Sequence, residues 1–158
     1  MIRAVLDTSA VSSAVFWPRS DANRVLAALA LRYWHHYTTP EVFGEYERVA
    51  ARLALRFPGA NWVGRLAWLR QRSTWLAAQP LGKQRSRDAS DDPILACGVA
   101  SQAAWIITRD PDLLEWEGPL ASVSQLLPAS SIFSEKPTDP IGLSNSEVGE
   151  DPSWDSIC

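Results

Sequence analysis

Cysteine is scarce in this chain of 158 residues: Cys97 and Cys158 are the only two. Two cysteines are too few for a disulfide framework or a thiolate zinc site, so neither class is expected. No apolar run reaches the roughly 18 residues that a membrane-spanning helix needs, which argues against a transmembrane protein. The sequence opens directly on the strand-like letters MIRAVLD without a signal-peptide layout, and we therefore expect a cytoplasmic protein.

Lysine is also scarce, since only two of the 15 basic residues are lysine and the others are arginine. The charges divide unevenly: residues 1–128 carry a net charge of +2, whereas residues 129–158, with one lysine and six acids, carry −5. Over the whole chain, 46% hydrophobic and 21% charged residues describe an ordinary globular protein. An arginine-rich body of this kind suits a polyanionic partner.

Short apolar segments alternate with amphipathic ones along the first 133 residues. The expected strands are 2–6, 37–39, 105–108 and 122–126, and the expected helices are 20–31, 40–57, one beginning after Asn61, 94–103 and 111–116. Residues 75–78 fit either a last helical turn or a short edge strand, residues 81–91 read as a loop, and Pro128 could start a turn ending near Phe133. This alternation predicts a three-layer α/β/α sandwich with a central parallel sheet. Residues 134–158 have the composition of a disordered tail.

Four acids lie where the expected strands end or the expected helices run. Asp7 follows the first strand, Glu45 lies inside a helix, Asp92 begins a helix, and Asp110 follows the strand at 105–108. Ligands of open α/β sheets bind at the carboxyl edge of the strands. Several carboxylates at that edge would repel one another unless a cation lay between them, so the pattern predicts a site for Mg²⁺ or Mn²⁺.

A divalent cation in an oxygen-ligand site is the usual apparatus for cleaving phosphate esters, which makes a metal-dependent nuclease the favoured interpretation. Asp91 and Asp112 are reserve ligands. Thr8, Ser9 and Thr108 are candidates for binding a metal-bound water or a phosphate oxygen. Arg85, Arg87 and Arg109 flank the acids and are candidates for guiding the nucleic-acid backbone.

Each of these residues also has a purely structural interpretation. Asp7 could simply end a strand in a turn, Glu45 could lie on an exposed helix surface, and Asp92 and Asp110 could cap the helices that follow them. Only the ordered set of four points specifically to metal chemistry.

Several residues outside the set have roles that the sequence leaves more open. His35 and His36 precede an expected strand, and a structural or surface role is favoured for them over metal binding. Trp17 lies in the expected loop after the first strand and is a candidate for a substrate or partner contact. The remaining tryptophans that fit packing positions are Trp62, Trp68 and Trp105, and Cys97 reads as a small buried residue.

Four segments resemble the PIN domain family: LDTS at 6–9, PEVFGEYERV at 40–49, DDPILACGVA at 91–100 and WIITRDPDLL at 105–114. The resemblance covers residues 2–133 in order and spacing, and is greatest to the branch described as toxins of toxin–antitoxin systems. It implies a Mg²⁺- or Mn²⁺-dependent endoribonuclease acting on RNA, with a small antitoxin protein as partner. By the same resemblance Asp7, Glu45, Asp92 and Asp110 match the acidic quartet of the family, and Ser9 stands where asparagine is common.

Two other functions compete with this interpretation. The Asp7-Thr8-Ser9 opening loosely resembles that of haloacid-dehalogenase phosphatases, but the second aspartate of that motif is replaced by Ser9 and no suitable lysine follows. A PIN-like module that binds RNA or a partner without cleaving it is the second alternative. The sequence also leaves open whether the chain forms a homodimer.

Overall fold

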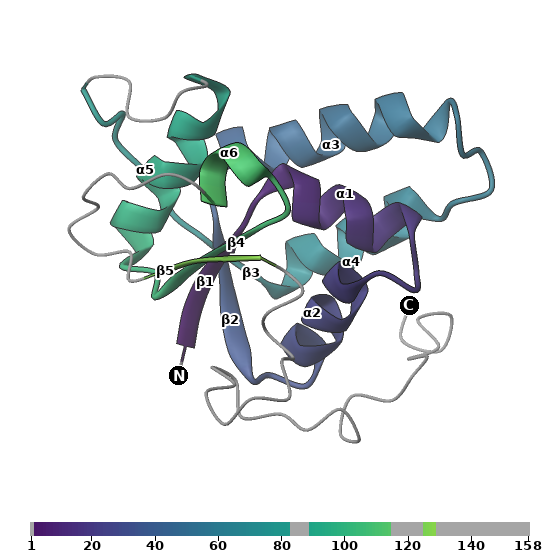
Figure 1. The fold of residues 1–158 in the computed structure, drawn as a ribbon, viewed down its shortest axis with the longest axis horizontal. Helices are drawn as coiled ribbons and strands as arrows, with labels where there is room; N and C mark the ends of the chain where they lie inside the picture. The colour runs from purple at the N-terminus through teal and green to yellow at the C-terminus, as the bar shows by residue number, and fades with distance from the viewer. Residues whose placement is uncertain (1, 83–88, 115–124, 129–158) are drawn as a thin grey trace.

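A computed structural model describes residues 2–82, 89–114 and 125–128 of the chain. Its centre is a parallel five-stranded sheet of order β3-β2-β1-β4-β5 (Figure 1). The strands are β1 (Ile2–Leu6), β2 (Trp34–Thr38), β3 (Ser73–Trp75), β4 (Trp105–Thr108) and β5 (Gln125–Pro128). The helices are α1 (Thr8–Phe16), α2 (Asp21–Ala30), α3 (Pro40–Ala54), α4 (Trp62–Arg72), α5 (Asp92–Ser101) and α6 (Pro111–Leu114), with a 3₁₀ turn at Ala89–Asp91.

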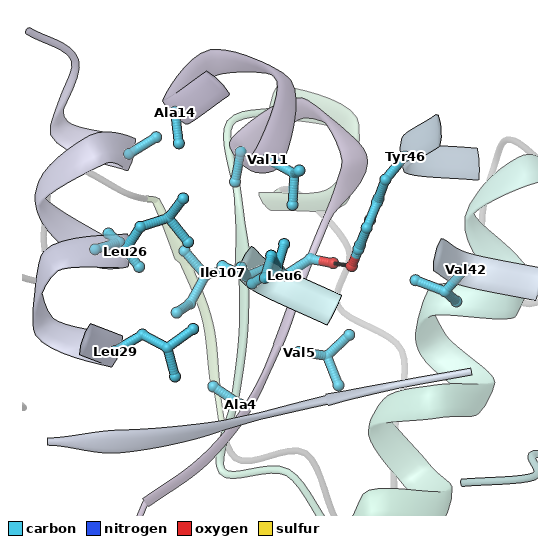
Figure 2. Close-up of a cluster of buried hydrophobic side chains, with 14 of the residues drawn as sticks. Ala4, Val5, Leu6, Val11, Ala14, Leu26, Leu29, Val42, Tyr46 and Ile107 are labelled. Atoms are coloured by element: carbon cyan, nitrogen blue, oxygen red, sulfur yellow. Dashed lines mark hydrogen bonds between the residues drawn. The ribbon is translucent and has the colours of Figure 1, made fainter. Parts of the chain in front are cut away.

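Helices cover both faces of the sheet, which confirms the predicted three-layer architecture. In Figure 2, Leu26 and Leu29 of α2 lie on one side of β1, and Val42 and Tyr46 of α3 lie on the other. Strand β1 pairs with β2 on one edge and with β4 on the other, so it is the central strand. A parallel strand covered on both faces needs a continuous apolar sequence, and the buried run Ala4-Val5-Leu6 supplies one.

Helix α1 is the element that sequence periodicity missed. Asp7-Thr8-Ser9 was expected to form a turn leading into a loop that contained Trp17. Instead Asp7 caps a helix that extends to Phe16, and its carboxylate accepts from the Ser9 amide. Residues Ala10–Phe16 are all buried, so the helix lacks the polar face that would produce a periodic pattern.

Other elements were placed correctly but with shifted ends. Strand β2 starts at Trp34 and not at Tyr37, and both histidines therefore lie inside it. Helix α3 is capped by Thr39 as expected but ends at Ala54, before Phe57. Of the two options for the segment near Trp75, the edge strand is the one observed.

The C-terminal elements also differ in extent from their predictions. Helix α5 begins at Asp92 and ends at Ser101, and β5 occupies 125–128, so that Pro128 closes a strand where a helical turn was expected. The predicted loop residues 83–88, the end of the helix at 111–116, the turn to Phe133 and the tail 134–158 lie outside the described residues. Within the described part of the chain, no helix is long and apolar enough to cross a membrane.

His36 is a fully buried histidine in the middle of β2. Its Nδ1 is 2.8 Å from Ser73 Oγ, and its ring contacts the rings of Trp34 and Tyr46. Among the described residues its Nε2 has no hydrogen-bond partner. Burial lowers the pKa of His36 from 6.5 to about 3, because a charged imidazole would lose its hydration there. The expected structural role is the one that this environment supports.

We predict that His36 makes the protein sensitive to acid. The unfolded chain takes up a proton near pH 6.5 and the folded chain only near pH 3, so stability falls as the pH drops below 6.5. Between pH 6.5 and 5 the loss from this residue should be about 2 kcal/mol. Urea unfolding at both pH values should show a smaller loss for His36→Phe, whereas the exposed control His35→Gln should follow the wild type. Equal losses in all three proteins would contradict this account.

Candidate functional site

Asp7 lies directly after the central strand, at the carboxyl edge of the sheet, and is 5% exposed. The described hydrogen bonds to its side chain all end on one oxygen, Oδ2. That atom accepts from the Ser9 amide at 3.1 Å, from the Thr108 hydroxyl at 2.8 Å and from the Ser9 hydroxyl. The carboxylate is thus held in one orientation by neutral donors, and no described residue donates a hydrogen bond to its Oδ1.

The two hydroxyls that hold Asp7 also connect the end of β4 to the start of α1. Ser9 Oγ accepts from the Arg109 amide at 2.9 Å, and Thr108 Oγ1 accepts from the Asp110 amide at 2.9 Å. Asp110 is therefore brought beside Asp7 by two short links through Thr108. Ser9 and Thr108 were expected to contact a metal-bound water or a phosphate, but the structure directs both hydroxyls to the carboxylate.

Asp7 has no cationic partner among the described residues, whereas Glu45 pairs with Arg48 and Glu47 pairs with Arg70. Burying a carboxylate is costly, and buried charges in proteins are generally paired with an opposite charge or coordinated to a metal. The three neutral donors resemble the outer hydrogen bonds that orient metal-binding carboxylates. The chemistry of Asp7 therefore fits a ligand of a divalent cation.

Glu45 lies on α3, one residue before an anchor of that helix to β1. The neighbouring Tyr46 is buried and donates its hydroxyl hydrogen bond to the Leu6 carbonyl, one residue before Asp7 (Figure 2). Burial and the charge of Asp7 both contribute to a pKa of Tyr46 well above its usual value, so the hydroxyl remains a donor. The Glu45 carboxylate is 33% exposed and pairs with Arg48 on its own helix. An exposed pair of this kind contributes only about 0.3–0.5 kcal/mol, so the carboxylate can exchange it for a cation.

Asp92 lies on the other side of the sheet edge, as the first residue of α5. It lines a cleft of about 650 Å³ together with Glu41, which is one helical turn before Glu45 on α3. The predicted capping role of Asp92 is wrong, because the N-cap position belongs to Asp91 and the Asp91 side chain makes no capping bond. Asp91 is 7% exposed, about as buried as Asp7, whereas Asp92 lines the cleft.

The four acids do not form a closed metal cage. Among the described residues, no three His, Cys, Asp or Glu side chains gather closely enough to hold a metal ion. Mg²⁺ seldom needs such a cage, because it commonly keeps several waters and uses one or two carboxylates together with substrate phosphates. Asp7 and one neighbouring carboxylate would therefore be enough protein ligands for Mg²⁺. The reserve residue Asp112 lies in α6, and Arg85 and Arg87 fall outside the described residues.

A second, open hollow of about 390 Å³ lies on the α1 side of Asp7, and half of its lining residues were candidates from the sequence. It is lined by Thr8, Ser9, Ser12, Ser13, Trp17, Val49, Leu53 and Arg109. The Arg109 guanidinium donates to Ser13 Oγ across this hollow. Ser12 and Ser13 were missed because α1 was not expected, and only the helical serine repeat after an Asp cap could have indicated it.

One family model, described as PIN domain, matches residues 3–112, which is more than half of the chain. A search of curated proteins finds no significant match.

We predict that Tyr46→Phe weakens the fold by about 1–3 kcal/mol, because it leaves the buried Leu6 carbonyl without its donor. Chemical denaturation would measure the change. Tyr33→Phe is the matched control, since Tyr33 is 40% exposed, and it should alter stability by less than about 0.5 kcal/mol. If Tyr46→Phe behaved like the control, the hydroxyl would not be anchoring α3 to the site.

We predict that Thr108→Val lowers the affinity for Mn²⁺ by about 10- to 100-fold, because the hydroxyl orients the Asp7 carboxylate. Calorimetric titration with Mn²⁺ would measure it. Thr74→Val on the exposed edge strand is the control and should leave the affinity unchanged. An unchanged affinity in folded Thr108→Val would show that this hydrogen bond has no part in metal binding.

Proposed function

We propose that this chain, which belongs to the PIN domain family, is a Mg²⁺- or Mn²⁺-dependent endoribonuclease. PIN domains are generally nucleases and generally use divalent metal ions. The observation that carries the proposal is the buried Asp7 carboxylate, which neutral donors hold on one oxygen and no described cation neutralises. Such a group at the carboxyl edge of a parallel sheet is suited to hold a cation for phosphodiester hydrolysis.

When bound, Mg²⁺ or Mn²⁺ supplies a water that is nucleophilic near neutral pH and charge compensation on the phosphate. Asp7 would hold the ion, with Glu45, Asp92 and Asp110 as the other proposed ligands. Ser9 and Thr108 keep the Asp7 carboxylate in one orientation. The carboxylate therefore would not need to reorient during the reaction. Arg109 places a positive charge beside Ser13 and would hold a phosphate of the RNA backbone near the acids.

The biological part of the proposal is a toxin of a toxin–antitoxin pair acting in the cytoplasm, with a small antitoxin protein as partner. Its support is the resemblance of the four motif segments to that branch of the family. Finding a small DNA-binding protein in the adjacent reading frame, and neutralisation of the nuclease by that protein, would test it. A homodimer is compatible with this role.

We predict that Asp7→Asn reduces RNA cleavage by more than about 100-fold. Losing a metal ligand should reduce activity at least as much as losing the hydrogen bonds that orient it, which typically reduces activity about 10- to 100-fold. The fold should remain intact or gain stability, because the substitution removes a buried charge. The measurement is sequencing of cleavage products from total RNA, with and without Mn²⁺. Asp21→Asn, an exposed acid in the first turn of α2, is the matched control.

Undiminished cleavage by Asp7→Asn would contradict the proposed site. A wild-type protein that binds Mn²⁺ and leaves every RNA intact would instead favour the non-cleaving binding module. Trapping of a covalent aspartyl-phosphate on Asp7 would favour the phosphatase.

A further inference from the structure

The hollow between α1 and α3 is lined on its α3 side by a row of apolar residues. The two helices lie side by side (Figure 1). Val49 and Leu53 line the hollow, and Phe57 follows Leu53 by one further helical turn. The Phe57 amide donates to the Leu53 carbonyl at 3.0 Å, so the helical spacing continues to this residue. The three side chains therefore lie on one face of the helix.

Trp17 faces this row from the end of α1. It is 46% exposed, and its ring meets that of Phe57 edge-on, with centroids 5.4 Å apart. Phe57 is itself 38% exposed, and the buried Phe16 contacts both rings and fixes the pair to the core. Trp17, Val49, Leu53 and Phe57 are together named the Trp17 patch. A contiguous exposed apolar surface of this kind is where proteins commonly bind another apolar group.

Positive charge borders the Trp17 patch on two sides. Arg52 and Arg56 lie one residue before two members of the apolar row, and both are exposed. Arg19 is exposed two residues beyond Trp17. None of these three arginines has an ion-pair partner among the described residues. The occupant that complements the patch should therefore combine apolar side chains with negative charge.

A second copy of the same patch does not meet this requirement. Most homodimers place one surface against itself across a two-fold axis. Such a contact would bring the three bordering arginines of one copy against the same arginines of the other. Like charges that meet across an interface are unfavourable, so an acidic segment is the better complement.

One segment of this chain has the required composition. Residues 147–157 read EVGEDPSWDSI, which combines four acids with Trp154 and Ile157 and contains no basic residue. The acids match the bordering arginines in charge. Trp154 matches the exposed aromatic pair in kind, because aromatic rings favour contact with one another in edge-to-face or offset arrangements.

The described part of the chain ends close to the hollow. Pro128, its last residue, pairs with Thr108 in the register of β5 and β4, and Arg109, which follows Thr108, lines the hollow. Trp154 lies 26 residues beyond Pro128, a length of chain that can span at most about 90 Å, whereas α1 is only about 14 Å long. The tether can therefore reach the Trp17 patch. A tethered segment meets its site at an effective concentration of up to about millimolar, so even a weak contact forms.

We propose that residues 147–157 dock on the Trp17 patch of the same chain, with Trp154 against its exposed aromatic pair and the four acids beside the bordering arginines. The contact covers the apolar row at this end of the hollow. It goes beyond the proposed function and does not depend on it, because none of the residues involved is a proposed metal ligand.

The test uses the full chain in solution with a nitroxide spin label on Cys158. Cys97 is fully buried, so the label should attach to Cys158 alone, which mass spectrometry checks. The docked segment should broaden the indole N–H signal of Trp17 in the NMR spectrum beyond detection, and reduction of the label should restore that signal. Trp75 is the control: it is 39% exposed, contacts Phe43 at the other end of α3, and should keep its intensity.

Substitutions with a matched control separate the parts of the contact. In the labelled chain, Trp154→Ala should remove the broadening at Trp17, whereas the neighbouring Ser153→Ala should retain it. Arg52→Gln combined with Arg56→Gln should weaken the broadening, and so should salt of about 1 M, where charges are screened beyond about 3 Å. In the chain without a label, Trp154→Ala should still shift the Trp17 signal, which excludes the label as the cause of docking. The same spectra show whether each variant is folded.

Equal intensities of the Trp17 and Trp75 signals in the labelled wild type, or broadening that survives in folded Trp154→Ala, would overturn the proposal. A mixture of spin-labelled chain with isotope-labelled chain that lacks the spin label tests the second copy. Broadening in that mixture would place the segment on a neighbouring chain and overturn the intramolecular contact, whereas its absence would support it. None of these measurements reads RNA cleavage, so failure of the proposed nuclease and failure of the docking contact are distinguishable.

Discussion

The arrangement at the sheet edge depends on the way one buried carboxylate is satisfied. Asp7 caps α1, accepts from Ser9 and Thr108 through a single oxygen, and lies in a place where an uncompensated charge is expensive. The same contacts fix the start of α1 and the end of β4. Burying this charge therefore lowers the stability of the fold. Such local destabilisation is common where a protein prepares a site for a ligand of opposite charge.

The strand order turns this local arrangement into a site. Since β1 lies between β2 and β4, segments that are far apart in the sequence follow neighbouring strands at one edge. Tyr46 then ties α3 to the last residue of β1. On one side of this centre lies the cleft that Asp92 lines, and on the other lies the hollow that leads to Trp17.

The sequence predicted those helices and strands whose polar and apolar residues alternate or separate clearly. The apolar run of β1, the capping letters Thr39-Pro40 and the strand at Trp105–Thr108 are strong local signals, and all three elements form as expected. Residues 10–16 of α1 are buried and give no such contrast, so the helix and the places of Ser12 and Ser13 beside the hollow were not predicted. The positions of the acids follow from the strand order, but the pairing of Ser9 and Thr108 with Asp7 depends on three-dimensional packing that no spacing encodes.

The most direct test of the account measures whether the folded protein is stabilised by the cation that Asp7 is thought to need. Thermal unfolding of the wild type should shift upward with Mn²⁺, gaining about 1.4 kcal/mol for each tenfold rise in Mn²⁺ well above the dissociation constant. The shift should disappear in Asp7→Asn, because the carboxylate that binds the ion is gone. A wild-type protein that is indifferent to Mn²⁺, or a shift of equal size in both proteins, would contradict the claim that Asp7 is a metal ligand.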